Sequence, residues 1–131
     1  MEPSNLVYPK ESYRVTGVLY ATHNELGRFC NEKQYCDRVE QIFKELGIKY
    51  EREKILPPSF EAELPGRNKI DFIVEGKIIL ECKAKRVLTR EDYYQAKRYL
   101  RSYNKKLALL VNFRDKYIRP KRILNSLVKE D

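Results

Sequence analysis

Apolar residues recur at helical spacing in the first third of the chain. Residues 12–26 repeat apolar side chains at every third or fourth position, which predicts a first helix with Ser12 as its N-cap and Gly27 as its stop. Residues 32–46 have the same period and end at Gly47. We therefore expect two successive helices joined by a short link.

The middle of the chain alternates apolar and polar residues, which is typical of strands. Residues 48–56 form the first expected strand, which ends at a pair of prolines that cannot continue a ladder. Residues 59–68 hold a Pro-Gly pair and predict a loop, with room for a short strand around residues 60–64. Residues 69–84 contain two apolar runs on either side of a Glu-Gly pair, which predicts an antiparallel hairpin.

The last third predicts one more helix, a buried strand and a terminal helix. Thr89 and Asp92 form a capping pair, so we expect a helix that begins at Thr89 and reaches about Asn104. The expected inner face of this helix consists of Tyr93, Ala96, Leu100 and Tyr103. The unbroken apolar run at residues 107–111 is typical of a strand buried on both faces. A short C-terminal helix is expected to begin near Pro120.

The order helix, helix, three strands, helix and strand indicates an α/β sandwich in which helices flank a central mixed sheet. A chain of 131 residues is large enough to form a core without staples, so residues 1–131 are expected to form a single domain. Residues 1–10 carry two prolines and show no periodicity. We expect a loose N-terminal arm there.

Three charged residues interrupt the apolar runs of the expected hairpin, where a core strand has none. Asp71 lies in the first run, and Glu81 and Lys83 lie two positions apart in the second, so the latter two share a face. Charged side chains are rarely buried without a partner or a metal ion. Solvated charges on an edge hairpin are an equal alternative, because a chain with 35% charged residues contains such spacings by chance.

The length of the hairpin loop decides whether these charges meet. With a two-residue loop, Asp71 lies across from Leu80 and faces away from Glu81. With a three-residue loop at residues 74–76, whose glycine is left-handed, Asp71 lies across from Ile79 and shares the face of Glu81. We expect the three-residue loop.

Basic residues outnumber acidic ones by 27 to 19, which gives a net charge of +8 and a pI of about 9.4. This balance favours a polyanionic partner, nucleic acid first, and the alternative is a highly charged solvated surface. Three cysteines without a Cys-x-x-Cys pair indicate neither a zinc ribbon nor a disulfide framework, and they fit a reduced, cytoplasmic setting. The chain has no apolar run of the roughly 20 residues that cross a bilayer and no signal-peptide pattern, so we expect a soluble protein without a membrane partner.

Two further residues have open alternatives. Glu32 lies at the head of the apolar stripe of the second helix, where it either faces solvent in the first turn or points toward Asp71 and Glu81. The single histidine, His23, lies near the end of the first helix and is more often a packed or capping residue than a ligand.

Several short motifs stand in register along the chain. An H-x-x-L-G-x-x-x-x-E-x-x-Y pattern is formed by His23, Leu26, Gly27, Glu32 and Tyr35. An Asp before an E-x-K strand is formed by Asp71, Glu81 and Lys83, and a Q-x-x-x-Y-L segment by Gln95, Tyr99 and Leu100. Asn112 and Phe113 follow the buried run, and a K-R-I segment occupies residues 121–123. With these motifs the chain resembles the GxxExxY protein family, within the PD-(D/E)XK nuclease superfamily and its restriction-endonuclease-like fold, over about residues 15–123. Phe29 stands where that family has the glycine of its name.

The resemblance implies an enzyme that hydrolyses phosphodiester bonds with a metal ion. By it, Glu32, Asp71 and Glu81 would bind Mg²⁺ or Mn²⁺, and Lys83 would position the attacking water. Carboxylate oxygens are hard ligands that suit these cations. Gln95 would orient the site from the third helix, or else be a surface amide.

The implied activity is that of a DNA endonuclease or nickase, and a Holliday-junction resolvase acting as a homodimer is the alternative enzyme. A non-catalytic nucleic-acid-binding or interaction module on the same fold is the alternative from another class. Lys85 and Arg86 directly follow the E-x-K strand and are expected to contact nucleic acid, DNA or RNA.

Overall fold

The computed structural model describes residues 7–128, which form three helices and a five-stranded mixed sheet. The helices are α1 (Pro9–Leu26), α2 (Glu32–Leu46) and α3 (Arg90–Ser102). The strands are β1 (Tyr50–Ile55), β2 (Lys69–Val74), β3 (Ile78–Lys83), β4 (Leu107–Asn112) and β5 (Lys121–Leu124). They lie in the order β1-β2-β3-β4-β5, in which β3 and β4 are parallel and the other neighbours antiparallel. The predicted α/β sandwich with a central mixed sheet is confirmed.

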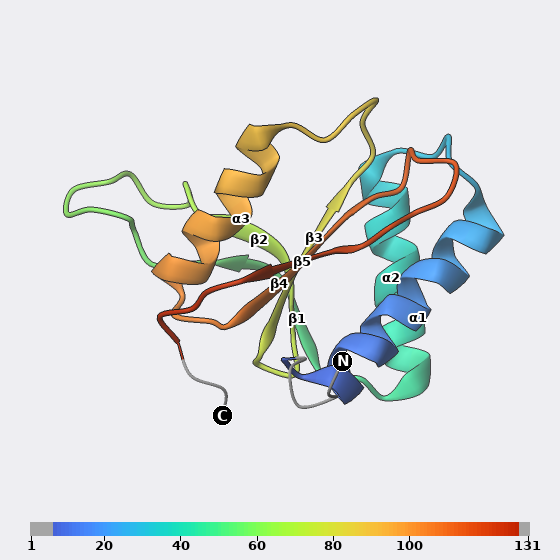
Figure 1. Cartoon of the computed structure of the whole chain (residues 1–131), viewed down its shortest axis with the longest axis horizontal. Coiled ribbons are helices and arrows are strands. Elements are labelled where there is room, and N and C mark those ends of the chain that lie inside the picture. The colour runs from blue at the N-terminus through green and yellow to red at the C-terminus, as the bar shows by residue number, and fades with distance from the viewer. Residues whose placement is uncertain (1–6, 129–131) are drawn as a thin grey trace.

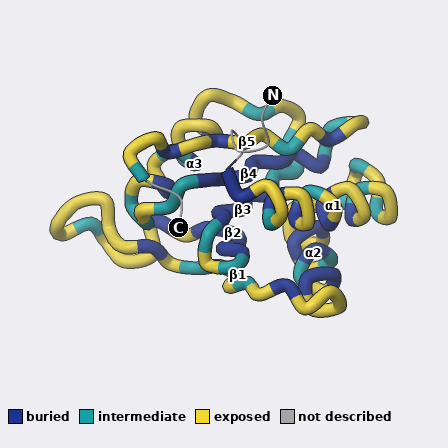
Figure 2. The backbone as a smooth tube through the Cα atoms, turned by 60° about the horizontal axis from the view of Figure 1, so that its bottom comes forward, coloured by how far each residue is buried: buried dark blue, intermediate teal, exposed yellow. Residues whose placement is uncertain are grey.

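The sheet lies between two helical layers, with α1 and α2 on one face and α3 on the other (Figure 1). The core on the first face joins α1 and α2 to side chains such as Phe72 and Leu80 of the sheet. The core on the second face joins Ala96 and Leu100 of α3 to side chains such as Ile79. Coverage on both faces explains the unbroken apolar run of β4, which is buried along its whole length (Figure 2).

Helix α2 begins and ends where the sequence predicts. The Asn31 side chain accepts a hydrogen bond from the backbone N–H of Gln34, and the Gln34 side chain accepts one from the N–H of Asn31, each at 2.8 Å. Gly47 closes the helix in the left-handed conformation, with φ of 68°. This reciprocal cap places Glu32 in the first turn, at the end of the helix nearest the candidate site described below.

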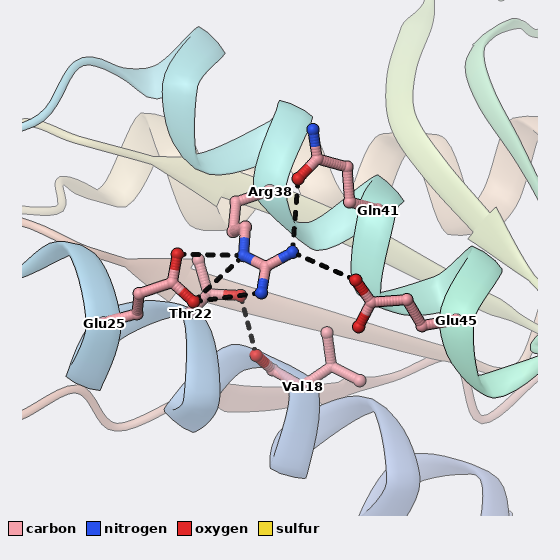
Figure 3. A network of polar contacts seen from close by, with 6 residues as sticks. All are labelled: Val18, Thr22, Glu25, Arg38, Gln41 and Glu45. Carbon is pink, nitrogen blue, oxygen red and sulfur yellow. Dashed lines mark hydrogen bonds and ion pairs between the residues drawn. The ribbon is translucent and has the colours of Figure 1, made fainter.

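Arg38 of α2 holds the two helices of the first layer together at the surface. Its guanidinium lies 3.0 Å from the carboxylate of Glu25 in α1, and 3.2 and 3.4 Å from Gln41 and Glu45 in α2 (Figure 3). Exposed ion pairs of this kind contribute only about 0–1 kcal/mol each. The apolar core therefore does most to hold α1 against α2.

Helix α1 starts earlier than predicted. It begins at Pro9, so Ser12 is a buried residue within the first turn, and its hydroxyl donates to the Pro9 carbonyl at 3.3 Å. The prediction that Ser12 is the N-cap is wrong, because proline suits the first helical position and extends the helix. The loose arm expected at residues 1–10 is wrong for residues 9–10, and its residues 1–6 lie outside the described part of the chain.

The C-terminal helix predicted near Pro120 is also wrong, because residues 121–124 form β5 and pair with β4. Residues 60–64 form turns and bends rather than the optional short strand. On α3 the inner face contains Tyr99, which is 3% exposed, whereas Tyr93 is 37% exposed and belongs to the outer face.

Candidate metal centre

The hairpin between β2 and β3 turns through three residues, 75–77, because Val74 pairs with Ile78. Gly76 adopts the left-handed conformation at φ of 65° that the tight turn requires. The predicted odd loop is confirmed, but it begins one residue later than expected.

The register of this hairpin decides where Asp71 lies. Phe72 and Leu80 form the last pair of the ladder away from the turn, so the next level along the two strands holds Asp71 and Glu81. The expectation that Asp71 lies across from Ile79 is wrong, because the loop begins one residue later and Ile79 pairs with Ile73. The loop still has three residues, so Asp71 and Glu81 remain on one face, and they now lie directly across from each other.

At this level side-chain carboxylates, rather than backbone carbonyls, accept hydrogen bonds from the backbone of the opposite strand. The backbone N–H of Asp71 donates to Oε2 of Glu81 at 2.8 Å, and the backbone N–H of Cys82 donates to Oδ2 of Asp71 at 2.7 Å. Each carboxylate therefore accepts an amide of the opposite strand, and the two are held beside each other at the end of the paired region. One oxygen of each is engaged in this way, and the two carboxyl groups also hydrogen-bond to each other.

Burial makes both acids harder to ionise. Burial, and then the charge of Asp71, raises the pKa of Glu81 to about 8. Burial also raises the pKa of Asp71, although the amide of Cys82 and the charge of Lys83 act in the opposite direction. Two acids held together with raised pKa values are the arrangement that a cation relieves.

Lys83 of β3 contacts Gln95 of α3. Nζ of Lys83 donates to Oε1 of Gln95 at 3.4 Å, a long hydrogen bond between two partly buried side chains. Tyr99 lies one turn further along α3, where burial and then the charge of Glu81 raise its pKa. Helix α3 therefore contacts the same end of β3 from which the E-x-K side chains project.

Glu32 lies at the rim of the site. It lines a pocket of about 260 Å³ together with Lys33, Cys36, Arg52, Glu53 and Asp71. Although its side chain reaches solvent, burial and then the charge of Asp71 raise its pKa, while Lys83 lowers it. Glu32 is therefore exposed in the first turn of α2 and also lines the same pocket as Asp71, and each alternative for it keeps some support.

The closest cluster of potential ligand atoms differs from the predicted one. Within residues 7–128, a set of three His, Cys, Asp or Glu donors that all lie within 4.8 Å of one another is formed by Cys36, Asp71 and Cys82. Glu32 and Glu81 are not members of this set. The cysteines were missed because residues 36 and 82 are far apart in the sequence and form no recognisable ligand spacing.

The two basic residues after β3 differ from each other. Nζ of Lys85 lies 2.8 Å from Oδ2 of Asp92. The Asn112 side chain also accepts from the backbone N–H of Lys85 and donates to its carbonyl, at 3.0 and 2.8 Å. The contacts of Lys85 therefore hold the segment that follows β3 in place. Arg86 is left exposed to solvent.

His23 packs rather than facing the site. Its Nε2 bonds the carbonyl of Asp115 at 2.9 Å, and its ring stacks on Phe113 at a centroid distance of 6.3 Å. These contacts join the end of α1 to the loop after β4. The structure favours the packed alternative for this histidine.

A second feature that the sequence did not single out is a surface of arginine and aromatic side chains beside α2. Phe29, in the loop between α1 and α2, is 79% exposed, and the guanidinium groups of Arg28 and Arg114 lie 5.2 and 5.9 Å from its ring centroid. The basic and aromatic composition of the chain was the only signal for it.

The sequence model of the PD-(D/E)XK nuclease superfamily matches residues 9–123. The chain belongs to this superfamily. The match spans all eight elements except the last residue of β5, and it agrees with the mixed sheet flanked by helices. No curated protein and no solved structure shows significant similarity to the chain. Within residues 7–128, no helix is long and apolar enough to span a membrane.

The acidic residues suit the divalent metal ion that nucleases of this superfamily typically use. Asp71 and Glu81 supply hard oxygen ligands, are buried together, and each has one oxygen free of the backbone. A divalent cation between them would replace their mutual repulsion by attraction. The donor set therefore fits Mg²⁺ or Mn²⁺.

Proposed function

We propose that this protein is a metal-dependent DNA endonuclease or nickase of the GxxExxY type. The observation that carries the proposal is the pair Asp71 and Glu81, held side by side at the open end of the β2–β3 ladder, with Lys83 two residues further along β3. Burying an acidic pair costs free energy, so a hairpin with a purely structural role is not expected to contain one beside a lysine.

Asp71 and Glu81 are the proposed inner ligands for Mg²⁺ or Mn²⁺, and Glu32 the proposed outer one. Mg²⁺ commonly takes one or two protein carboxylates and keeps several waters, so Glu32 need not lie as close as the other two. A bound divalent cation supplies Lewis-acid chemistry, because it withdraws charge from the scissile phosphate and acidifies water.

Lys83 is proposed to position the attacking water and to stabilise the negative charge that develops on the phosphate. Its ammonium group donates a hydrogen bond of 3.4 Å to the side-chain carbonyl oxygen of Gln95. Gln95 is then a positioning residue that restricts where the lysine points.

The substrate is proposed to reach this site over a basic surface. Arg86 is exposed next to it, while Lys85 would bind phosphate only by leaving Asp92. Arg28 and Arg114 add charge around the exposed ring of Phe29, on which an unpaired base could stack. A net charge of +8 supports phosphate contacts as the main source of affinity.

Cleavage assays with purified protein test the proposal. Linear, nicked, single-stranded and branched DNA, and single-stranded RNA, are incubated with Mg²⁺ or Mn²⁺, and binding is followed separately by fluorescence anisotropy in Ca²⁺. We expect the wild type to cut at least one DNA and Lys83→Ala to lower that rate by about 10²–10⁴-fold with little change in binding. Lys44→Ala, an exposed lysine in the last turn of α2, is the matched control.

The other outcomes separate the alternatives. A rate unchanged in Lys83→Ala contradicts the proposal and assigns the cleavage to another site or protein. A wild type that binds DNA and cuts none of the panel favours the non-catalytic module. Preferential, symmetric cutting of branched DNA by a dimer, with the mass checked by light scattering, favours the resolvase.

A further inference from the structure

A second potential metal site lies directly behind the acidic pair. Cys36 comes from α2, Asp71 from β2 and Cys82 from β3, and one ligand atom of each lies within 4.8 Å of the other two. We propose that these three side chains bind a soft divalent metal ion, Zn²⁺ in the first instance, at a position separate from the proposed Mg²⁺ position.

The alternation of β3 separates the two positions. Cys82 packs in the core between the sheet and the helices α1 and α2, as does Leu80, whereas Ile79 packs against α3. Cys82 therefore faces away from Glu81 and Lys83. Asp71 is the residue common to both positions, because its carboxylate contacts the backbone beside Glu81 and also lies in the cysteine cluster.

The donor types select a different cation from that of the acidic pair. Two thiolates and a carboxylate are three ligands of a tetrahedral zinc site, with the fourth position open to water. Thiolates favour Zn²⁺ over Mg²⁺, which prefers oxygen ligands. On binding, each thiol releases its proton to solvent, so a dication exchanges with two protons.

The distances already approach those of a bound site. Two sulfur atoms bound to one tetrahedral Zn²⁺ at about 2.3 Å lie about 3.8 Å apart. The ligand atoms of Cys36, Asp71 and Cys82 all lie within 4.8 Å of one another, so the sulfur atoms need to approach each other by about 1 Å at most. The sulfur atoms belong to reduced cysteines, since Cys36 and Cys82 form no disulfide.

An ion has a path to the cluster from solvent. The pocket of about 260 Å³ whose rim carries Glu32 is also lined by Cys36 and Asp71. Cys36 is 5% exposed and Cys82 is fully buried. Cys36 and Asp71 would therefore meet the ion first, and Cys82 would complete the site from within.

The third cysteine offers a matched control. Cys30 lies in the loop between α1 and α2, is partly exposed, and its sulfur contacts the carbonyl of Leu26 at 3.8 Å. It is outside the cluster of Cys36, Asp71 and Cys82. Metal binding by the thiols of the cluster must therefore be retained when Cys30 is replaced.

Spectroscopic titration tests the proposal without any assay of cleavage. Reduced full-length protein in a phosphine reductant is titrated with Cd²⁺, and the ultraviolet thiolate-to-cadmium charge-transfer band is recorded, with Co²⁺ as a second probe for tetrahedral geometry. We expect one Cd²⁺ per chain in wild type and in Cys30→Ala. Cys36→Ala and Asp71→Asn are expected to bind at least about 10-fold more weakly, because even the supporting contacts of a metal ligand are worth that much.

Several results would overturn the proposal. They are the absence of a band in the wild type, a band that persists at full affinity in Cys36→Ala, and a band lost in Cys30→Ala. Cys82→Ala is a further variant, and since it opens a space in the core, circular dichroism first establishes that it folds. If it does not fold, Cys36→Ala and Asp71→Asn decide the question.

The consequence for cleavage rests on the proposed function and is measured separately. Zn²⁺ bound at the cysteines would draw Asp71 away from the acidic pair and inhibit Mg²⁺-dependent cutting. We expect this inhibition to need at least about 10-fold more Zn²⁺ in Cys36→Ala than in wild type, each relative to its own rate without Zn²⁺. A wild type that cleaves no DNA even without Zn²⁺ would contradict the proposed nuclease. The charge-transfer titration would still decide whether the cysteines bind a metal ion.

Discussion

The two ends of the β2–β3 hairpin are built from opposite kinds of residue. At the turn, pairs such as Ile73 with Ile79 and Val74 with Ile78 are apolar, buried and joined by a regular ladder. At the other end, Asp71 and Glu81 accept the backbone amides that a ladder would otherwise use. The apolar pairs hold the hairpin in place, so that the acidic end can keep an arrangement that is costly without a cation.

The largest effect on stability is expected at the apolar end. Phe72→Ala should lower the free energy of unfolding by about 3–5 kcal/mol, because it leaves a cavity in the core beside Phe43 and Tyr50. Urea denaturation at pH 4 measures the change. Glu81→Gln is the comparison at the acidic end and should change it by less than about 1 kcal/mol, because near that pH Glu81 is largely protonated in both the folded and the unfolded chain and the amide has a similar shape. Equal losses at the two ends would contradict the division.

The next effect is that of metal ions on the acidic end. Mn²⁺ at about 100 times its dissociation constant should stabilise the wild type by roughly 2.7 kcal/mol, because it binds the folded state. The rise in Tm in a thermal melt measures this, and Glu81→Gln should blunt it. Glu75→Gln, in the turn of the same hairpin, is the control and should keep the full rise. A rise of equal size in Glu81→Gln would place the metal elsewhere.

A further effect concerns pH in the absence of metal ions. The pKa of Glu81 is raised from its usual value of about 4.3 to about 8, so folding favours its protonated form. Its contribution to stability is present below about 4.3 and is lost as the pH rises toward 8. Wild type should therefore lose more stability than Glu81→Gln between pH 5 and pH 8 in urea titrations. The difference between the two proteins isolates Glu81 from the other acids, and a difference of the opposite sign would contradict the raised pKa.

The smallest effect is expected for single phosphate contacts. Arg86→Ala, next to the acidic end, should weaken binding to duplex DNA and reduce the slope of log affinity against log salt concentration by up to about 0.9. Lys49→Ala, an exposed residue next to the turn end, should leave the slope unchanged. Anisotropy titrations at several salt concentrations make the comparison. Identical slopes in the two variants would remove Arg86 from the interface.

Much of the fold could be predicted from local signals. The bounds of α2 follow from a helical apolar stripe and a glycine stop, and the buried strand β4 follows from an unbroken apolar run. These signals are strong because each concerns residues within a few positions of one another. That Asp71 and Glu81 share one face was predicted in the same way, from alternation and the length of one turn.

The errors occurred where distant contacts decide the local structure. Residues 121–124 carry too few apolar side chains to indicate a strand, and Ile123 is the buried residue among them. They become β5 because β4 offers an unpaired edge. The turn of the hairpin lies one residue later than predicted. The register is set by the buried pairs between β2 and β3, and the turn residues alone do not determine it.

The sequence by itself determined the order of the elements from α1 to β4, the parity of the hairpin and the identity of its acidic residues. These properties follow from periodicity and turn chemistry, which act over short stretches of chain. Only the tertiary structure decided that Cys36 and Cys82 meet beside Asp71 and that Lys83 meets Gln95. The physical reason is that these contacts arise from the packing of α2 and α3 on opposite faces of one sheet, and side chains brought together by packing need no particular spacing along the chain.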